Sequence, residues 1–294
     1  MIPVLFLIAT ATFFMMHLAP GSPFDAEKKM SKEIRARVEA HYGLDKPLFV
    51  QYLIQMKHLA QGNLGPSLKY PSRTVNEIIA DSFPVSLELG SEALVVALVL
   101  GLTAGLIASL RQNTTLDYVP MSMAMIGLCV PTFVMGPLLI SAFSLHANWF
   151  NAAGWFFPSD RVLPAVTLGA YYAAYIARLS RGGLLEILNQ DFIRTARAKG
   201  AGAGRVLFKH ALRGGLMPVV SFLGPAIAGL LTGSFVVETI FGIPGLGRYF
   251  VTAAFNRDYF MVEGATLFYA TFVIVLNLAA DVIAVWLNPK LRFE

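Results

Sequence analysis

Charged residues are scarce in this chain of 294 residues. Asp, Glu, Lys and Arg together make up 14% of it, hydrophobic residues make up 56%, and the mean hydropathy is +0.61. A soluble domain averages about 25% charged residues, and a soluble protein of this size has too little interior to bury so many apolar side chains. Disorder is excluded as well, because it needs low hydrophobicity and high charge. The composition therefore indicates a polytopic membrane protein.

Cysteine and catalytic motifs are also missing. Cys129 is the only cysteine, which excludes an intrachain disulfide and a cysteine metal cluster. There is no His-Glu-x-x-His, no Gly-x-Ser-x-Gly and no phosphate loop. The glycine-rich run 200–205 lacks the Lys-Ser/Thr pair and follows no strand, so it does not fit a nucleotide site. We expect no catalytic residues, no metal, no cofactor and no ATP hydrolysis by this chain. The histidines lie far apart in sequence and are expected to be packed or interfacial: His17, His41, His58, His146 and His210.

The chain has long apolar runs instead. A membrane-spanning helix needs about 20 mostly apolar residues. We therefore predict an all-α fold, a polytopic membrane helix bundle with six transmembrane helices. The six runs are 2–18, 87–110, 119–145, 162–179, 216–240 and 262–287. The first run is short, and a signal peptide is its alternative. That alternative is disfavoured because the run has no basic flank and no good cleavage site.

Positive charge is uneven between the loops. The short loops after the third and fifth runs hold only Arg161, Arg248 and Arg257, whereas the region around 180–215 holds eight basic residues. Cytoplasmic loops carry the excess of Lys and Arg. We therefore place 180–215 and both termini in the cytoplasm and 21–84 outside. The eight residues are Arg178, Arg181, Arg194, Arg197, Lys199, Arg205, Lys209 and Arg213.

This topology divides the chain into three parts. Residues 1–20 form the first transmembrane helix, 21–84 an external segment, and 85–294 a five-helix core. In the external segment, Pro47 is expected to open an amphipathic helix. Thr74 and Glu77 fit a capping box. The segment is interpreted either as a docking surface for an external partner or as a layer lying on the membrane.

Small residues and prolines recur within the runs. Gly101 with Gly105, and Gly229 with Gly233, form small-xxx-small patterns that let two helices approach closely. The prolines Pro131, Pro137, Pro218 and Pro225 are expected to break the third and fifth runs. These features suit a bundle that rearranges around a passage, and equally ordinary helix packing in a membrane.

Polar residues in the runs, four glutamates, one aspartate and one asparagine, fall into two groups. Glu92 lies deep in its run, and Asn277 deeper still, and neither has a recognisable partner in the sequence. The others lie near predicted ends, where water in the headgroup region is expected to reach them: Glu88, Glu238, Glu263 and Asp281.

The most informative stretch lies in the basic loop. It reads as a short helix that Asp191 caps and Gly200 ends, followed by a second helix over 205–213 that leads into the fifth run. A partner that moved this helix would push on the bundle, while a partnerless cytoplasmic loop is the alternative. The stretch is Asp191, Phe192, Ile193, Arg194, Thr195, Ala196, Arg197, Ala198, Lys199 and Gly200.

This stretch carries a resemblance to a known family. Residues 193–200 and 209–212, the latter including His210 and Leu212, resemble the cytoplasmic loop of the membrane subunits of binding-protein-dependent ABC importers, in the peptide and nickel branch. The chain is most similar to the B-type subunits of oligopeptide permeases. Further matching blocks lie at 18–24, 42–47, 62–67, 237–247, 256–259 and 288–290. Such subunits usually begin with a basic stretch before the first span, so the resemblance predicts a trimmed or misassigned start.

The resemblance implies a type I ABC importer permease fold in a bacterial inner membrane. It implies a homologous second permease subunit, two cytoplasmic ATPase subunits that bind the ATP, and an extracytoplasmic peptide-binding protein. The chain would form half of the pathway for oligopeptides, with the 191–200 helix receiving the ATPase motion. Dipeptides, nickel or glutathione are alternative cargoes within the branch.

A self-contained secondary transporter is the alternative from another class. It would need coupling-ion residues at the midplane and often an internal repeat, and the two halves show no convincing repeat. An intramembrane hydrolase would need a nucleophile–base pair, which the sequence does not offer.

Overall fold

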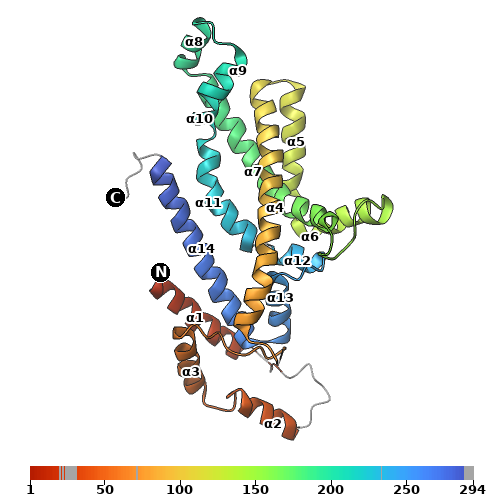
Figure 1. Cartoon of the computed structure of the whole chain (residues 1–294), viewed down its shortest axis with the longest axis vertical. Coiled ribbons are helices and arrows are strands. Elements are labelled where there is room, and N and C mark those ends of the chain that lie inside the picture. The colour runs from red at the N-terminus through yellow and green to blue at the C-terminus, as the bar shows by residue number, and fades with distance from the viewer. Residues whose placement is uncertain (20, 22, 24–31, 71, 233, 288–294) are drawn as a thin grey trace. The chain divides into compact units, whose positions relative to one another are not determined.

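The computed structural model describes residues 1–19, 21, 23, 32–70, 72–232 and 234–287 (Figure 1). Over these residues the secondary structure is helical, apart from one isolated bridge between Pro66 and Thr74. The predicted all-α class is confirmed. The chain forms two compact units, Met1–Val85 with Pro244–Ile274 and Ser86–Ile243 with Val275–Glu294. The long helices α4 (Val75–Leu110) and α14 (Tyr259–Leu287) contribute to both.

The first unit is built on the beginnings of α4 and α14. Its other helices are α1 (Ile2–Leu18), α2 (Lys32–His41), α3 (Leu48–Ala60) and α13 (Leu246–Asn256). Its core joins residues of α4, α13 and α14, among them Val75, Ile78, Leu246, Met261 and Ala265.

A buried carboxylate fastens a loop onto this core. Asp258, 1% exposed, accepts hydrogen bonds from Ser67 Oγ (2.5 Å) and from the Lys69 backbone N–H (3.1 Å). Its other oxygen accepts one from the Met261 N–H (3.2 Å), as a capping side chain does at a helix start. Nearby, burial raises the pKa of the Tyr70 hydroxyl.

Two predicted helix starts in this unit are confirmed. Pro47 is the N-cap residue of α3. Thr74 and Glu77 form the capping box: the Glu77 carboxylate accepts the Thr74 N–H (2.9 Å), and Thr74 Oγ1 accepts the Glu77 N–H (3.3 Å). The helix that follows does not end before the second apolar run, because α4 continues through Pro84 to Leu110.

The second unit is arranged around α7 (Val162–Leu188), which contacts α5 (Thr115–Cys129), α6 (Thr132–Leu139) and α11 (Met217–Thr232). A π-helix, η1 (Ile140–His146), extends α6, and a 3-10 turn, η2 (Pro158–Arg161), precedes α7. After α7 come α8 (Asp191–Ala198), α9 (Ala203–Arg205), the π-helix η3 (Val206–Ala211) and α10 (Leu212–Gly215). The short α12 (Phe235–Ile240) follows α11.

Each of the six predicted runs is helical among the described residues, and four or five of them are long and apolar enough to cross a membrane. Among the described residues, four helices are long and apolar enough to cross a membrane: Val75–Leu110, Pro158–Leu188, Met217–Ile240 and Tyr259–Ala279. The first run forms an apolar helix of 17 residues, Ile2–Leu18. The third run is two helices, Thr115–Cys129 and Thr132–His146, bent by 109° relative to each other.

The bend in the third run follows from proline chemistry. Pro131 has no backbone N–H to donate and disfavours helical geometry at Val130, which is extended (ψ 116°). The predicted break at Pro131 is therefore confirmed. The other expected breaks differ, since Pro137 and Pro225 lie inside α6 and α11 and Pro218 occupies the second position of α11.

Candidate functional site

The predicted helix in the basic loop is α8, Asp191–Ala198, and in Figure 1 it projects beyond the end of α7. Its N-cap is Gln190, so the prediction that Asp191 caps the helix is wrong by one residue. Asp191 instead occupies the first helical position, where a negative charge is favoured by the helix dipole. Its carboxylate pairs with Arg194 at 3.3 Å on the exposed surface.

The predicted end at Gly200 is confirmed. Gly200 has φ +84°, a left-handed conformation that glycine adopts without strain. Its N–H donates to the Arg197 carbonyl (3.0 Å), and the Ala201 N–H donates to the Ala196 carbonyl (3.1 Å). These two bonds form a Schellman motif, which satisfies the last carbonyls of the helix and turns the chain.

One side chain of α8 is buried and the rest face outward. Ile193 is fully buried, and α8 packs against η3. Phe192 is 46% exposed and Ala196 is half-buried. The remaining members of the predicted set are exposed: Arg194, Thr195, Arg197, Ala198, Lys199 and Gly200. The helix thus presents a small, basic surface while a single isoleucine anchors it.

The segment after α8 is packed firmly on α7. Leu207 and Ala211 of η3 form a buried cluster with Leu184 of α7. Leu212 packs against this cluster, and so do Ile187, Leu188 and Leu106. His210 is half-buried. If α8 moves, the movement is transmitted to α7 through this packed apolar contact, because close-packed side chains resist compression.

Two glycines bring α7 and α10 into backbone contact. A Cβ on Gly183 would lie 2.2 Å from the Gly215 carbonyl oxygen, and one on Gly215 would lie 2.7 Å from Leu184 Cδ2. Gly182, the neighbour of Gly183, has no atom within 4 Å of its Cβ position. The glycine pairs 182–183 and 214–215 are the signal in the sequence for this contact, which was not predicted.

The predicted packing glycines lie against the same helix. A Cβ on Gly101 would lie 2.7 Å from the Ala173 carbonyl oxygen, and one on Gly105 would lie 1.9 Å from Ser180 Oγ. On α11, a Cβ on Gly229 would lie 2.2 Å from the Tyr172 hydroxyl. Gly233 lies outside the described residues.

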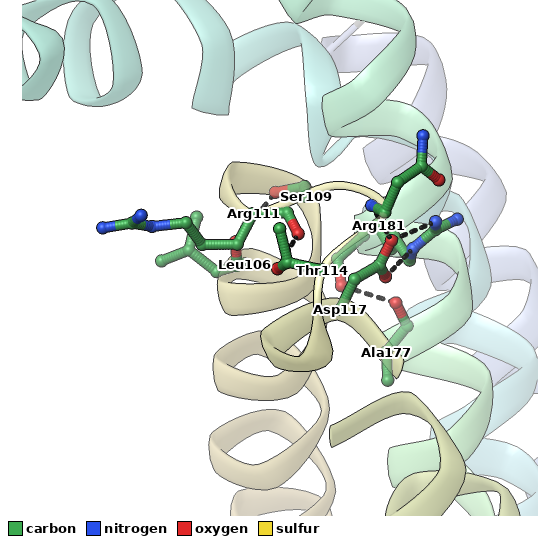
Figure 2. A network of polar contacts seen from close by, with 9 residues as sticks. Leu106, Ser109, Arg111, Thr114, Asp117, Ala177 and Arg181 are labelled. Atoms are coloured by element: carbon green, nitrogen blue, oxygen red, sulfur yellow. Dashed lines mark hydrogen bonds and ion pairs between the residues drawn. The ribbon is translucent and has the colours of Figure 1, made fainter. Parts of the chain in front are cut away.

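An ion pair ties the first turn of α5 to α7 (Figure 2). Arg181 donates from Nε to Asp117 Oδ1 (2.6 Å) and from Nη2 to Oδ2 (2.7 Å). Asp117 is 2% exposed and also accepts the Asn113 N–H (2.9 Å). From the sequence, Arg181 was expected only to contribute to membrane orientation, and no role was predicted for Asp117.

A second charged cluster surrounds Arg161. Its Nη1 lies 2.5 Å from Glu88 Oε1 and 3.6 Å from Glu92 Oε1. The Trp155 indole donates to Glu88 Oε2 (3.2 Å), and the Arg161 guanidinium lies 5.2 Å from the centre of that indole ring. Arg161 is therefore the partner of Glu92 that could not be recognised in the sequence.

Two other acids are more deeply placed than expected. Glu238 is fully buried and accepts hydrogen bonds from Ser86 (2.7 Å) and Ser234 (2.6 Å). Glu263 is 3% exposed. For both, the expectation of contact with headgroup water is wrong. No group of three potential metal ligands occurs among the described side chains.

Comparison with known proteins identifies the family. Residues 98–293 match the family described as binding-protein-dependent transport system inner membrane component. The oligopeptide transport system permease protein OppB of Haemophilus influenzae is 44% identical over 294 residues, covering 99% of this chain and 96% of the relative. The OppB of Salmonella typhimurium is 46% identical with the same coverage. The dipeptide transport system permease protein DppB of Bacillus subtilis is 43% identical, covering 100% of this chain and 96% of the relative.

Solved structures show the fold. An inward-facing structure of the MetNI methionine ABC transporter aligns with a TM-score of 0.58 at 19% identity, covering 72% of this chain and 96% of the other. An amino acid ABC transporter crystallised with histidines aligns with a TM-score of 0.54 at 18% identity, covering 74% and 95%. The fold is that of type I ABC importer permeases, and the chain belongs to the family of inner-membrane components of binding-protein-dependent transport systems.

Proposed function

We propose that this chain is the permease subunit of an ATP-driven importer that takes up oligopeptides delivered by an external binding protein. The observation that carries the proposal is similarity over almost the whole chain to proteins named as oligopeptide permeases. The DppB relative, at 43% identity, keeps dipeptides as the alternative cargo. Nickel and glutathione are further alternatives within the branch.

The partners and orientation belong to the same proposal. A homologous permease subunit completes the pathway, and two cytoplasmic ATPase subunits bind and hydrolyse the ATP, so this chain needs no cofactor of its own. The basic loop 180–215 and both termini lie in the cytoplasm, because basic residues concentrate there. The segment 21–84 lies outside, where a binding protein can reach it.

The contacts of α8 support its role as the coupling helix. Its exposed surface carries short side chains and basic side chains, which suits insertion into a groove of an ATPase. Behind it, Leu207 and Ala211 rest on Leu184 of α7, and Gly183 touches Gly215. Motion imposed on α8 is passed to α7, which in turn packs against α5, α6 and α11. The ATPase cycle thereby moves the helices around the passage.

Crosslinking tests the coupling role. In a Cys129→Ser background, cysteines introduced at Ala196 or Lys199 are expected to crosslink to an ATPase subunit in the assembled complex. A cysteine at the exposed Asn148, in the loop proposed to lie outside, is the matched control and should not crosslink. Wild-type ATPase binding and transport in Ala196→Trp or Gly200→Trp would contradict the coupling role.

Uptake measurements test the cargo. Deleting the gene is expected to abolish binding-protein-dependent uptake of a labelled oligopeptide. Normal oligopeptide uptake with loss of dipeptide, nickel or glutathione uptake would assign one of the alternatives. Uptake that persisted without ATP under an imposed ion gradient would instead identify a secondary transporter.

A further inference from the structure

Two cavities follow one another along α1 and α14 in the first unit. The first, of about 360 Å³, is bordered by Phe13 and His17 of α1 and by Tyr259, Phe260 and Glu263 of α14. The second, of about 600 Å³, is bordered on the same helices by residues one to three turns further along. These are Ile2, Leu5, Phe6 and Ala9 on α1 and Leu267, Phe268 and Thr271 on α14. α3 borders both cavities.

Two buried polar side chains, Glu263 and Gln55, lie beside each other in the first cavity. Glu263 and Gln55 are each 3% exposed, and both line the cavity. Among the described residues, neither Glu263 Oε1 nor Gln55 Nε2 has a partner in good hydrogen-bond geometry, but the Gln55 side chain lies close enough to act as a donor toward the Glu263 carboxylate. A buried polar group without a partner costs on the order of 1–3 kcal/mol. Because Gln55 faces Glu263, the group that this cavity offers to a ligand is the acceptor Glu263 Oε1.

The walls of this cavity suit a cation. Phe13, Tyr42, Tyr259 and Phe260 line it, and aromatic faces attract ammonium groups. His17 is part of the wall, since it stacks on Phe13 at 4.1 Å and both of its ring nitrogens already have partners. An ammonium group bearing N–H donors would satisfy the free oxygen of Glu263.

The mouth of the same cavity suits an anion. Lys46 and His41 line it and are exposed, and His58 lines it half-buried. Lys46 has no ion-pair partner among the described residues. The site therefore presents a carboxylate at its base and a positive charge at its mouth, the complement of a head group carrying both an ammonium and a phosphate.

The second cavity suits a hydrocarbon chain. Its lining is apolar apart from Asn76 and Thr271. The cavity opens onto the protein surface, where Ile2 and Phe6 are 82% and 58% exposed. α1 is apolar around its whole circumference, as a helix in contact with lipid is. A polar pocket followed by an apolar groove on the same helices matches the two ends of a phospholipid.

We propose that the first unit binds one phospholipid with a primary amine head group. Its ammonium is held by Glu263, its phosphate by Lys46 at the mouth, and one acyl chain lies in the groove bordered by Ala9 and Leu267. A trimethylated head group fits less well, because it has no N–H to donate to Glu263. The proposal concerns lipid binding by the chain and does not depend on which cargo is transported.

Native mass spectrometry tests the site without transport. The full chain is purified in detergent and mixed with equal amounts of phosphatidylethanolamine, phosphatidylcholine and phosphatidylglycerol with identical acyl chains. Phosphatidylethanolamine is expected to be retained about tenfold more than either of the others. The other two lipids have no ammonium N–H to donate to Glu263, and losing one such charge-assisted hydrogen bond lowers affinity by about this factor. Equal retention of the three lipids would overturn the proposal.

Variants assign the effect to these residues. Glu263→Gln should lower retention of phosphatidylethanolamine to that of phosphatidylcholine, while Asp45→Asn, at an exposed position outside the cavity lining, should leave it unchanged. If Glu263→Gln fails to fold, Ala9→Trp, which fills the groove, should reduce retention of phosphatidylethanolamine. A head-group preference that survives Glu263→Gln would overturn the ammonium site. Displacement of the lipid by glycerophosphoethanolamine at equal concentration would overturn the role of the acyl chain.

Discussion

Arg181 holds the buried carboxylate of Asp117 with two parallel hydrogen bonds, 2.6 and 2.7 Å long, from a helix 64 positions further along the chain. The pair fastens the first turn of α5 to α7. Arg181 lies two residues before Gly183, the glycine of α7 that contacts α10. Bidentate geometry of this kind is specific to arginine, because its planar guanidinium matches a carboxylate. The contact stiffens α7 at the point where the segment after α8 rests on it.

Removing Arg181 should therefore destabilise the protein. Arg181→Ala leaves Asp117 buried with only the Asn113 N–H as a charge-stabilising donor. We expect the free energy of unfolding to fall by about 2 kcal/mol. This is less than the usual cost of breaking a fully buried ion pair, because Arg181 is 29% exposed. Thermal denaturation of the purified permease complex measures it. The double variant Asp117→Asn/Arg181→Ala should lose less stability than the sum of the losses in Asp117→Asn and Arg181→Ala, and additive losses would contradict the coupling.

The neighbouring glycines of α7 offer a matched pair. Gly183→Ala places a methyl group 2.2 Å from the Gly215 carbonyl, so α10 must move away, whereas Gly182→Ala meets no atom within 4 Å. Overpacking typically costs about 1–3 kcal/mol. We expect Gly183→Ala to lower both the thermal stability of the complex and ATP-driven uptake. Gly182→Ala should match the wild type in both assays, and equal effects of the two variants would contradict the close contact.

Features of the fold and of the candidate site that depend on residues close together in the sequence could be predicted, whereas contacts between distant helices could not. Local signals worked: Thr74 and Glu77 gave a helix start, Gly200 gave a helix end, and Pro131 gave a break. Pairing across the bundle did not follow, because it depends on how one helix is rotated against another. Arg161 with Glu92, and Arg181 with Asp117, are therefore visible only in three dimensions.

The same limit applies to the cavity near α1. His17, His41 and His58 lie far apart in sequence, yet all three border one cavity with Glu263. No periodic pattern connects α1, the 40–46 loop, α3 and α14. Small-residue spacing indicated that Gly101, Gly105 and Gly229 allow close approach, but it could not name α7 as the partner.

The contact of Gly229 with Tyr172 predicts a rescue. Gly229→Ala puts a methyl group 2.2 Å from the Tyr172 hydroxyl, and the next atom of that ring lies at 3.2 Å. We expect Gly229→Ala to lower the thermal stability of the complex by about 1–3 kcal/mol. Adding Tyr172→Phe removes the clashing oxygen and should restore most of the loss. A double variant as unstable as Gly229→Ala alone would show that another atom sets the helix spacing.

The left-handed turn after α8 gives a test that separates backbone geometry from packing. Gly200 has φ +84° and Gly202 has φ −64°, and neither Cβ position has an atom within 4 Å. Gly200→Ala should therefore cost about 1 kcal/mol through strain in the Schellman turn alone, while Gly202→Ala should cost almost nothing. Because α8 is anchored by little more than Ile193, we expect the strained turn to loosen it. Crosslinking from a cysteine at Lys199 to the ATPase should then fall for Gly200→Ala and stay unchanged for Gly202→Ala. Equal crosslinking in both variants would mean that the ATPase, and not the turn, holds α8 in place.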